Sequence, residues 1–188
     1  KNIFLMTFTI ELIGAILLYF QFKDLDTGKR IFSAVFHSIS AFCNAGFSVF
    51  SNSFENYLSH AGINITLILL IVLGGIGFLV LDELMLFFRR KIRSFSKFSL
   101  HSRLVIISSF TLIAAGFLVI LVEELLNGSN ELSFGSNVLT ALFQSVTART
   151  AGFNTINLNV LSFASIFIIT LLMVIGASPG STGGGVKT

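Results

Sequence analysis

The chain has 188 residues, of which 54% are hydrophobic and 11% are charged, whereas a soluble domain carries about 25% charged residues. This composition excludes an ordinary soluble domain and indicates a protein embedded in a lipid bilayer. The net charge of +3 gives no basic surface for nucleic acid. The single cysteine excludes an internal disulfide and a cysteine-based metal site.

Four apolar stretches are long enough to cross a hydrocarbon core, which takes about 20 residues. In chain order they are residues 2–22, 61–81 with an extension to 88, 104–122 and 158–177. Two shorter apolar segments, residues 31–43 and 138–148, lie between them and are predicted to be buried or re-entrant helices. The expected fold class is therefore an all-α polytopic membrane protein.

The orientation follows from basic residues in the connection between the second and third stretches. This connection holds Arg89, Arg90, Lys91, Arg93, Lys97 and Arg103. The positive-inside rule places residues 89–103 in the cytoplasm, so both short helices belong to the outer half. The outer segments carry Asp24, Asp26, Glu55, Glu123, Glu124 and Glu131. These carboxylates either concentrate cations at an acidic mouth or are ordinary solvated loop charges.

The short apolar segments are copies of each other. Residues 33–41 match residues 140–148 in register. An Ala-Gly-Phe sequence follows in each copy, and in the second copy it comes one residue sooner. The two copies have the same orientation, which predicts two parallel repeats of membrane helix, pore helix with loop, and membrane helix, a potassium-channel-like arrangement. We expect the units to be residues 1–95 and 96–188.

The loop after each pore helix is the expected cation site. Glycine allows the backbone to turn its carbonyls to one side, a ring of carbonyls can replace the hydration shell of potassium, and the negative end of the pore helix points at the loop. No carboxylate lies in either loop, which disfavours a calcium filter. The expected filter residues are Asn44, Ala45 and Gly46, the first repeat loop, and Thr150, Ala151 and Gly152, the second repeat loop. The alternative is a packing repeat that binds no ion.

The fourth stretch runs into a segment that cannot remain helical. It contains the only proline of the sequence and a glycine run, both of which unwind helices. We expect a flexible gate below the filter, the break loop: Gly176, Ala177, Ser178, Pro179, Gly180, Ser181, Thr182, Gly183, Gly184 and Gly185. The same run is similar to a phosphate-binding loop, but Val186 separates Gly185 from Lys187, and no strand precedes it.

Single residues carry further expectations. His37 aligns with Gln144 and is expected to form hydrogen bonds behind the filter, and Cys43 is expected to pack there. A cation beside a potassium site is unfavourable, so Arg149 is expected to point away, toward a carboxylate or helix-end carbonyls. The glycines at 14, 74, 75, 77 and 116 are interpreted as sites of close helix packing.

Residues 36–48, 145–155 and 180–188 together resemble the Trk/Ktr/HKT superfamily of potassium transporters, most closely its bacterial Ktr membrane subunits. The resemblance covers nearly the whole chain and implies four membrane–pore–membrane units per full-length protein, of which this segment would hold the second and third. It implies a bacterial plasma-membrane protein whose full-length chains form homodimers and bind a cytosolic nucleotide-binding regulatory subunit. Potassium would be the substrate, with sodium open as an activator, and no cofactor or other metal is implied.

These observations favour potassium uptake through a backbone-carbonyl selectivity filter gated by the break loop. The chain shows no nucleophile–base constellation, so an enzyme is not expected. Two alternatives stay open. A proton- or sodium-coupled symporter would need an acidic residue such as Glu11 or Asp82 in the pathway, and a non-transporting membrane scaffold would tolerate bulkier residues at Gly46 and Gly152.

Overall fold

The helices of this protein follow the order that the sequence predicts. The computed structural model describes residues 2–89, 94–127 and 133–187, and over these residues it is all-α apart from one isolated parallel bridge between Ile175 and Val186. The α-helices are α1 (Asn2–Gln21), α2 (Thr27–Phe42), α3 (Ala61–Gly75), α4 (Phe78–Phe88), α5 (Leu100–Asn127), α6 (Phe134–Thr147) and α7 (Phe163–Val174), with short 3-10 turns η1 (Glu55–Tyr57), η2 (Phe95–Lys97) and η3 (Leu158–Val160).

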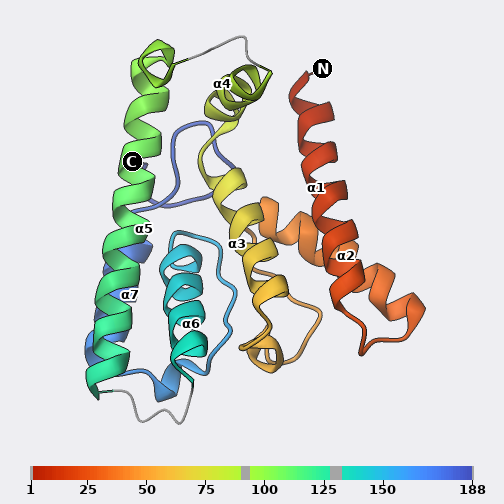
Figure 1. The fold of residues 1–188 in the computed structure, drawn as a ribbon, viewed down its shortest axis with the longest axis vertical. Coiled ribbons are helices and arrows are strands. Elements are labelled where there is room, and N and C mark those ends of the chain that lie inside the picture. Colours follow the sequence, from red (N-terminus) through yellow and green to blue (C-terminus); the bar gives the residue numbers. More distant parts are fainter. Residues whose placement is uncertain (1, 90–93, 128–132, 188) are drawn as a thin grey trace.

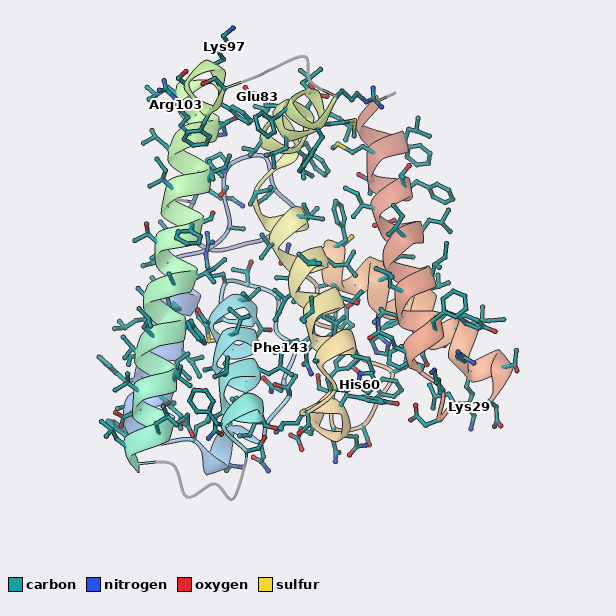
Figure 2. All side chains as sticks on the ribbon, viewed as in Figure 1. Lys29, His60, Glu83, Lys97, Arg103 and Phe143 are labelled. Atoms are coloured by element: carbon teal, nitrogen blue, oxygen red, sulfur yellow. The ribbon has the colours of Figure 1, made fainter. Side chains whose placement is uncertain are left out.

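The first and second helices of each repeat run in opposite directions. In Figure 1, α1 and α5 descend and α3 and α7 ascend, while α2 and α6, the two expected pore helices, both occupy the lower half. Figure 2 places Lys97 and Arg103 at the upper end, opposite Lys29 and His60. The described part of the basic connection therefore lies at the end away from the short helices, as the orientation requires. Arg90, Lys91, Arg93 and Glu131 lie outside the described residues.

The two repeats are held together internally by the same contacts. Ser38 on α2 donates a hydrogen bond to the Glu11 carbonyl at 2.6 Å, and Ser145 on α6 donates one to the Ile113 carbonyl at 2.8 Å. A side chain on Gly14 would collide with Ser38 and Leu70, and one on Gly116 would collide with Ser145 and Leu172. Each first helix therefore needs a glycine where its pore helix and its second helix cross it.

The second span is broken, which corrects the expectation of one continuous helix over residues 61–88. Helices α3 and α4 are bent by 112° at Ile76 and Gly77, and Gly77 has a φ of 90° that favours glycine. The break persists because carbonyls at the end of α3 accept hydrogen bonds from another segment: Ser178 donates its N–H to Gly75 at 3.0 Å.

The fourth stretch is also shorter than expected. Helix α7 has only 12 residues, because Ser162 caps its start and Ile175 leaves the helix to pair with Val186. Among the described helices, only α1 and α5 are long and apolar enough to cross a membrane alone, and α3 with α4 counts as a third if it is one broken span. Both second helices of the repeats thus break at equivalent positions, after Gly75 and after Val174.

Gly74 and Gly75 provide a matched test of how closely α3 approaches α2. A Cβ on Gly74 would overlap the Phe42 carbonyl oxygen, whereas one on Gly75 would have the Asn44 side chain as its nearest neighbour, at 3.8 Å. Backbone atoms cannot move aside as a flexible side chain can, so we expect Gly74→Ala to cost about 1–3 kcal/mol of stability and Gly75→Ala to be nearly neutral. The measurement is the thermal unfolding of both full-length variants in detergent, and equal melting temperatures would contradict the prediction.

Candidate functional site

The two repeat loops have the same unusual backbone. After α2, Asn44 and Gly46 adopt positive φ angles of 51° and 71°, and after α6, Thr150 and Gly152 adopt 75° and 84°. An asparagine tolerates this region, but a β-branched threonine is strained there. Such strain persists only where the surrounding structure enforces it, and it concentrates at functional sites. The repetition in both copies therefore marks these residues as a site.

Hydrogen bonds fix the direction of the loop carbonyls. The Ala45 N–H bonds back to the Ser40 carbonyl at 2.9 Å, and the Ala151 N–H bonds back to the Thr147 carbonyl at 3.0 Å. In a trans peptide the C=O points opposite to the N–H of the next residue. The carbonyls of Asn44 and Thr150 therefore point away from the pore helices.

The outward carbonyls of the two repeat loops have no competing donor. Among the described residues, no hydrogen bond is donated to the carbonyl oxygens of residues 44–46 or 150–152. Each loop also follows the C-terminal end of a pore helix, which carries partial negative charge. Carbonyl oxygens in a negative potential are suited to a desolvated monovalent cation such as potassium.

Each loop is closed by a hydroxyl at the same position of its pore helix. Ser40 Oγ donates to the Phe47 carbonyl at 2.8 Å, and Thr147 Oγ1 donates to the Phe153 carbonyl at 2.8 Å. These bonds join the last turn of each helix to the residue that follows Gly46 or Gly152. They help to hold the strained backbone in place.

An aromatic cluster lies behind the loops and joins the two repeats. His37 is fully buried, and its Nε2 accepts the Val49 N–H at 3.2 Å, so the expected hydrogen bond behind the loop is confirmed. The His37 ring lies 4.8 Å from the ring of Phe54, which lies 5.5 Å from that of Phe153. The Phe54 N–H also bonds to the Asn154 carbonyl at 2.8 Å. The second repeat loop is thereby fastened to the outer segment of the first repeat.

The two repeat loops touch each other at their glycines. A Cβ on Gly46 would overlap the Ala151 carbonyl oxygen, and one on Gly152 would lie 3.5 Å from the Gly46 Cα. The structure therefore brings all six expected filter residues into one site.

The break loop folds back on itself and lies against both repeats. The Gly176 N–H bonds to the Val186 carbonyl at 2.9 Å and the Ala177 N–H to the Gly184 carbonyl at 3.0 Å, which closes the loop at its base. In Figure 1 this segment runs between α5 and the break of α3 and α4. The Phe78 N–H at the start of α4 bonds to the Gly180 carbonyl at 3.1 Å. The break loop thus fills the gap that the bend leaves.

Thr182 joins the break loop to the first repeat loop. Its Oγ1 lies 2.9 Å from the Phe42 carbonyl and 3.2 Å from the Gly74 carbonyl, and it accepts a hydrogen bond from the Asn44 side chain at 3.2 Å. On the other side, a Cβ on Gly183 would lie 2.6 Å from the Thr150 hydroxyl oxygen. The break loop therefore contacts the first residue of each repeat loop.

Two single-residue expectations have different outcomes. Arg149 donates from Nη2 to the Gly176 carbonyl, just beyond α7, at 3.3 Å, which confirms the expected helix-end carbonyl. Cys43 is exposed, so the expectation that it packs behind the loop is wrong. The first copy is one residue longer, and Phe42 takes the buried position instead.

The outer carboxylates mostly have structural partners. Tyr57 donates to Asp24 at 2.5 Å, and burial together with this carboxylate raises the pKa of Tyr57. Glu123 and Glu124 accept hydrogen bonds from Ser162 and Ser165 near the start of α7.

Three features of the structure are not among the predictions from the sequence: the bend of α3 and α4, the hydroxyl bonds of Ser40 and Thr147, and the contacts of Thr182. A signal for the bend was present, because Gly77 lies two residues after the end of α3, just as Gly176 lies two residues after the end of α7. The hydroxyl bonds could have been suspected from the match of Ser40 with Thr147. No sequence signal pairs Thr182 with Phe42, because that contact depends on the tertiary fold.

Comparisons with known proteins agree with this geometry. The family model TrkH, described as "Cation transport protein", matches residues 1–188. The "Ktr system potassium uptake protein B" of Bacillus subtilis is 35% identical over the whole chain, and the "Potassium/sodium uptake protein NtpJ" of Enterococcus hirae is 34% identical over 95% of it. The chain spans 42% and 39% of these two relatives' lengths.

A solved structure has the same arrangement of helices. The crystal structure of the potassium transporter TrkH from Vibrio parahaemolyticus matches the whole chain with a TM-score of 0.79 at 24% identity, over 37% of its own length. At this identity the likeness supports the all-α fold with its two repeats.

Proposed function

The chain belongs to the TrkH family of cation transport proteins, and from that premise we propose that it forms part of the pathway of a potassium-uptake protein of the plasma membrane. Residues 44–46 and 150–152 would supply half of a backbone-carbonyl selectivity filter, and potassium would be the substrate. The relatives named potassium uptake proteins support this substrate. Ions would pass down their electrochemical gradient without covalent chemistry, so we do not propose an enzyme.

One observation carries the proposal. The carbonyls of Asn44 and Thr150 point away from the pore helices, and no described residue donates a hydrogen bond to the carbonyls of residues 44–46 or 150–152. A carbonyl without a donor costs free energy once it is shielded from water inside a membrane protein, unless a ligand takes that place. A dehydrated cation is the ligand that such oxygens suit.

The break loop, residues 176–185, is proposed as the gate. It contacts Asn44 through Thr182 and comes close to Thr150 through Gly183, so a movement of this loop would reach both filter loops. We further propose units at residues 1–95 and 96–188. The full-length chains would form a homodimer with a cytosolic nucleotide-binding regulatory subunit, an assignment that the name "Ktr system" of two relatives supports.

The proposal is tested by uptake of rubidium and potassium into cells that lack their own potassium systems and express the full-length protein. We expect saturable uptake that excess potassium inhibits more strongly than excess sodium. Equal inhibition by the two ions would contradict the proposal that these loops form a potassium-selective filter. If the full-length protein reaches the membrane but gives no more uptake than cells without it, the result would favour a non-transporting membrane scaffold.

Glu11 separates a passive pathway from a proton-coupled symporter. It lies on α1 and its backbone carbonyl already accepts the Ser38 bond, which depends on the backbone and survives a side-chain change. We therefore expect Glu11→Gln to leave uptake and its pH dependence unchanged within about twofold, because passive flow through a carbonyl filter needs no coupled proton. Asp82→Asn tests the second acidic residue that a symporter could use, and we expect the same result for it. Loss of a pH dependence in either variant would favour the symporter.

A further inference from the structure

Arg149 is a buried cation next to the second repeat loop, and binding of potassium by backbone carbonyls gives it no role. The residue precedes Thr150 directly and is only 8% exposed. Its guanidinium donates to the Gly176 carbonyl at 3.3 Å, and its Nε has no partner. Among the described residues it pairs with no carboxylate. A buried charge without a counter-ion is costly unless other groups stabilise it.

Three helix ends provide that stabilisation. Arg149 lines a small cavity of about 20 Å³ together with Gly75 at the end of α3, Val146 at the end of α6 and Ala177 just beyond α7. Helix C-termini carry partial negative charge. Arg149 therefore lies where the negative ends of three helices converge.

Both ends of the break loop meet the chain at Arg149 and Thr150. Gly176 begins the loop and accepts the Arg149 bond, whereas a Cβ on Gly183 or Gly185, near its other end, would lie 2.6 or 3.3 Å from side-chain atoms of Thr150. The first repeat offers a contrast. Asn44 and Thr150 share the positive φ, so Cys43 occupies the position of Arg149. In that repeat only Ile76 and Gly77 separate α3 from α4 at the bend, and no long loop follows the second helix.

We propose that Arg149 is a positioning residue of the gate: its guanidinium neutralises the ends of α3, α6 and α7 and anchors the start of the break loop at Gly176 beside the second repeat loop. That the break loop is a gate rests on the proposed function. Whether Arg149 anchors this loop can be tested without measuring transport. Removing the guanidinium would free the Gly176 carbonyl and let the loop leave the filter.

The anchoring is measured by thiol reactivity at Ser178, which lies near the start of the break loop and is fully buried. Cysteine has nearly the shape of serine, so Ser178→Cys fits the loop, and its thiol is shielded while the loop is in place. The full-length protein, with Cys43 and every other native cysteine replaced, is treated in membranes with a charged thiosulfonate reagent. We expect Arg149→Gln to raise the reaction rate roughly tenfold, since a buried bond to a charged donor is lost.

Two further variants make the test specific. Arg149→Lys keeps the charge but not the planar donor fork, and we expect it to raise the rate several-fold less than Arg149→Gln does. Arg89→Gln removes an exposed cation at the end of α4 and should leave the rate unchanged. If Arg149→Gln does not accumulate, the lysine variant decides, because a rate equal to that of the parent would overturn the anchoring.

Uptake separates this inference from the proposed function. With an anchored gate, Arg149→Gln should raise the maximal rate of potassium uptake and leave its KM unchanged, since the filter oxygens stay in place. An unchanged thiol reactivity overturns the anchoring. A raised reactivity with unchanged uptake supports the anchoring and overturns the assignment of the break loop as the gate.

Discussion

Replacing Gly46 by serine is expected to abolish potassium-selective uptake, and the same change at Gly152 is expected to weaken it less. Both residues have positive φ angles, of 71° and 84°, at which a side chain costs about 1–3 kcal/mol. Only Gly46 also faces backbone: a Cβ there would overlap the Ala151 carbonyl oxygen, whereas the nearest atom to one on Gly152 is 3.5 Å away. The Gly46 variant must therefore displace a carbonyl of the other repeat loop.

The measurement is rubidium uptake in competition with potassium and sodium, in cells expressing the full-length variants. We expect Gly46→Ser to reduce uptake at least tenfold, and Gly152→Ser to retain uptake with a preference for potassium over sodium that falls roughly tenfold, the effect of about 1.4 kcal/mol. Gly135→Ser is the control, because Gly135 lies near the start of α6 with no atom within 4 Å of its Cβ position. If Gly46→Ser transports like Gly135→Ser, the repeat loops are not the filter.

Replacing Thr182 by valine is expected to increase uptake. Valine has nearly the shape of threonine but lacks the hydroxyl that lies 2.9 Å from the Phe42 carbonyl and 3.2 Å from the Gly74 carbonyl. The change also leaves the Asn44 side chain without this acceptor. Each polar group left unpaired costs about 1–3 kcal/mol, and that cost applies only while the break loop lies against Phe42 and Gly74.

We expect the maximal rate of potassium uptake to rise roughly tenfold in Thr182→Val with the potassium preference retained, because the carbonyls of the repeat loops are unchanged. Thr170→Val is the matched control: Thr170 is exposed on α7 and bonds only to Ile166 in its own helix. A loss of uptake in Thr182→Val, with normal amounts of protein in the membrane, would instead make this hydroxyl a ligand in the pathway and remove its role in closing the gate.

The expectations that held are those with a local signal in the chain. Apolar stretches, basic residues and the repeated Ala-Gly-Phe predict the order and direction of the helices and the two repeat loops. The expectations that failed are the continuous second span, the length of the fourth span and the burial of Cys43. Phe42 rather than Cys43 is buried, because the extra residue of the first copy could be accommodated at either position and only packing selects one.

By itself, the sequence determined that this is a membrane protein with two parallel repeats, that a loop follows each short apolar helix, and that proline and glycine end the fourth stretch. Hydropathy and backbone preference determine these features because they act over a few neighbouring residues. Only the tertiary structure decided that α3 and α4 bend around the break loop, that Thr182 meets Phe42, that Gly46 lies against Ala151, and that Arg149 reaches Gly176. Each of these contacts joins segments far apart in the chain. Their geometry depends on how whole helices pack, which no local pattern specifies.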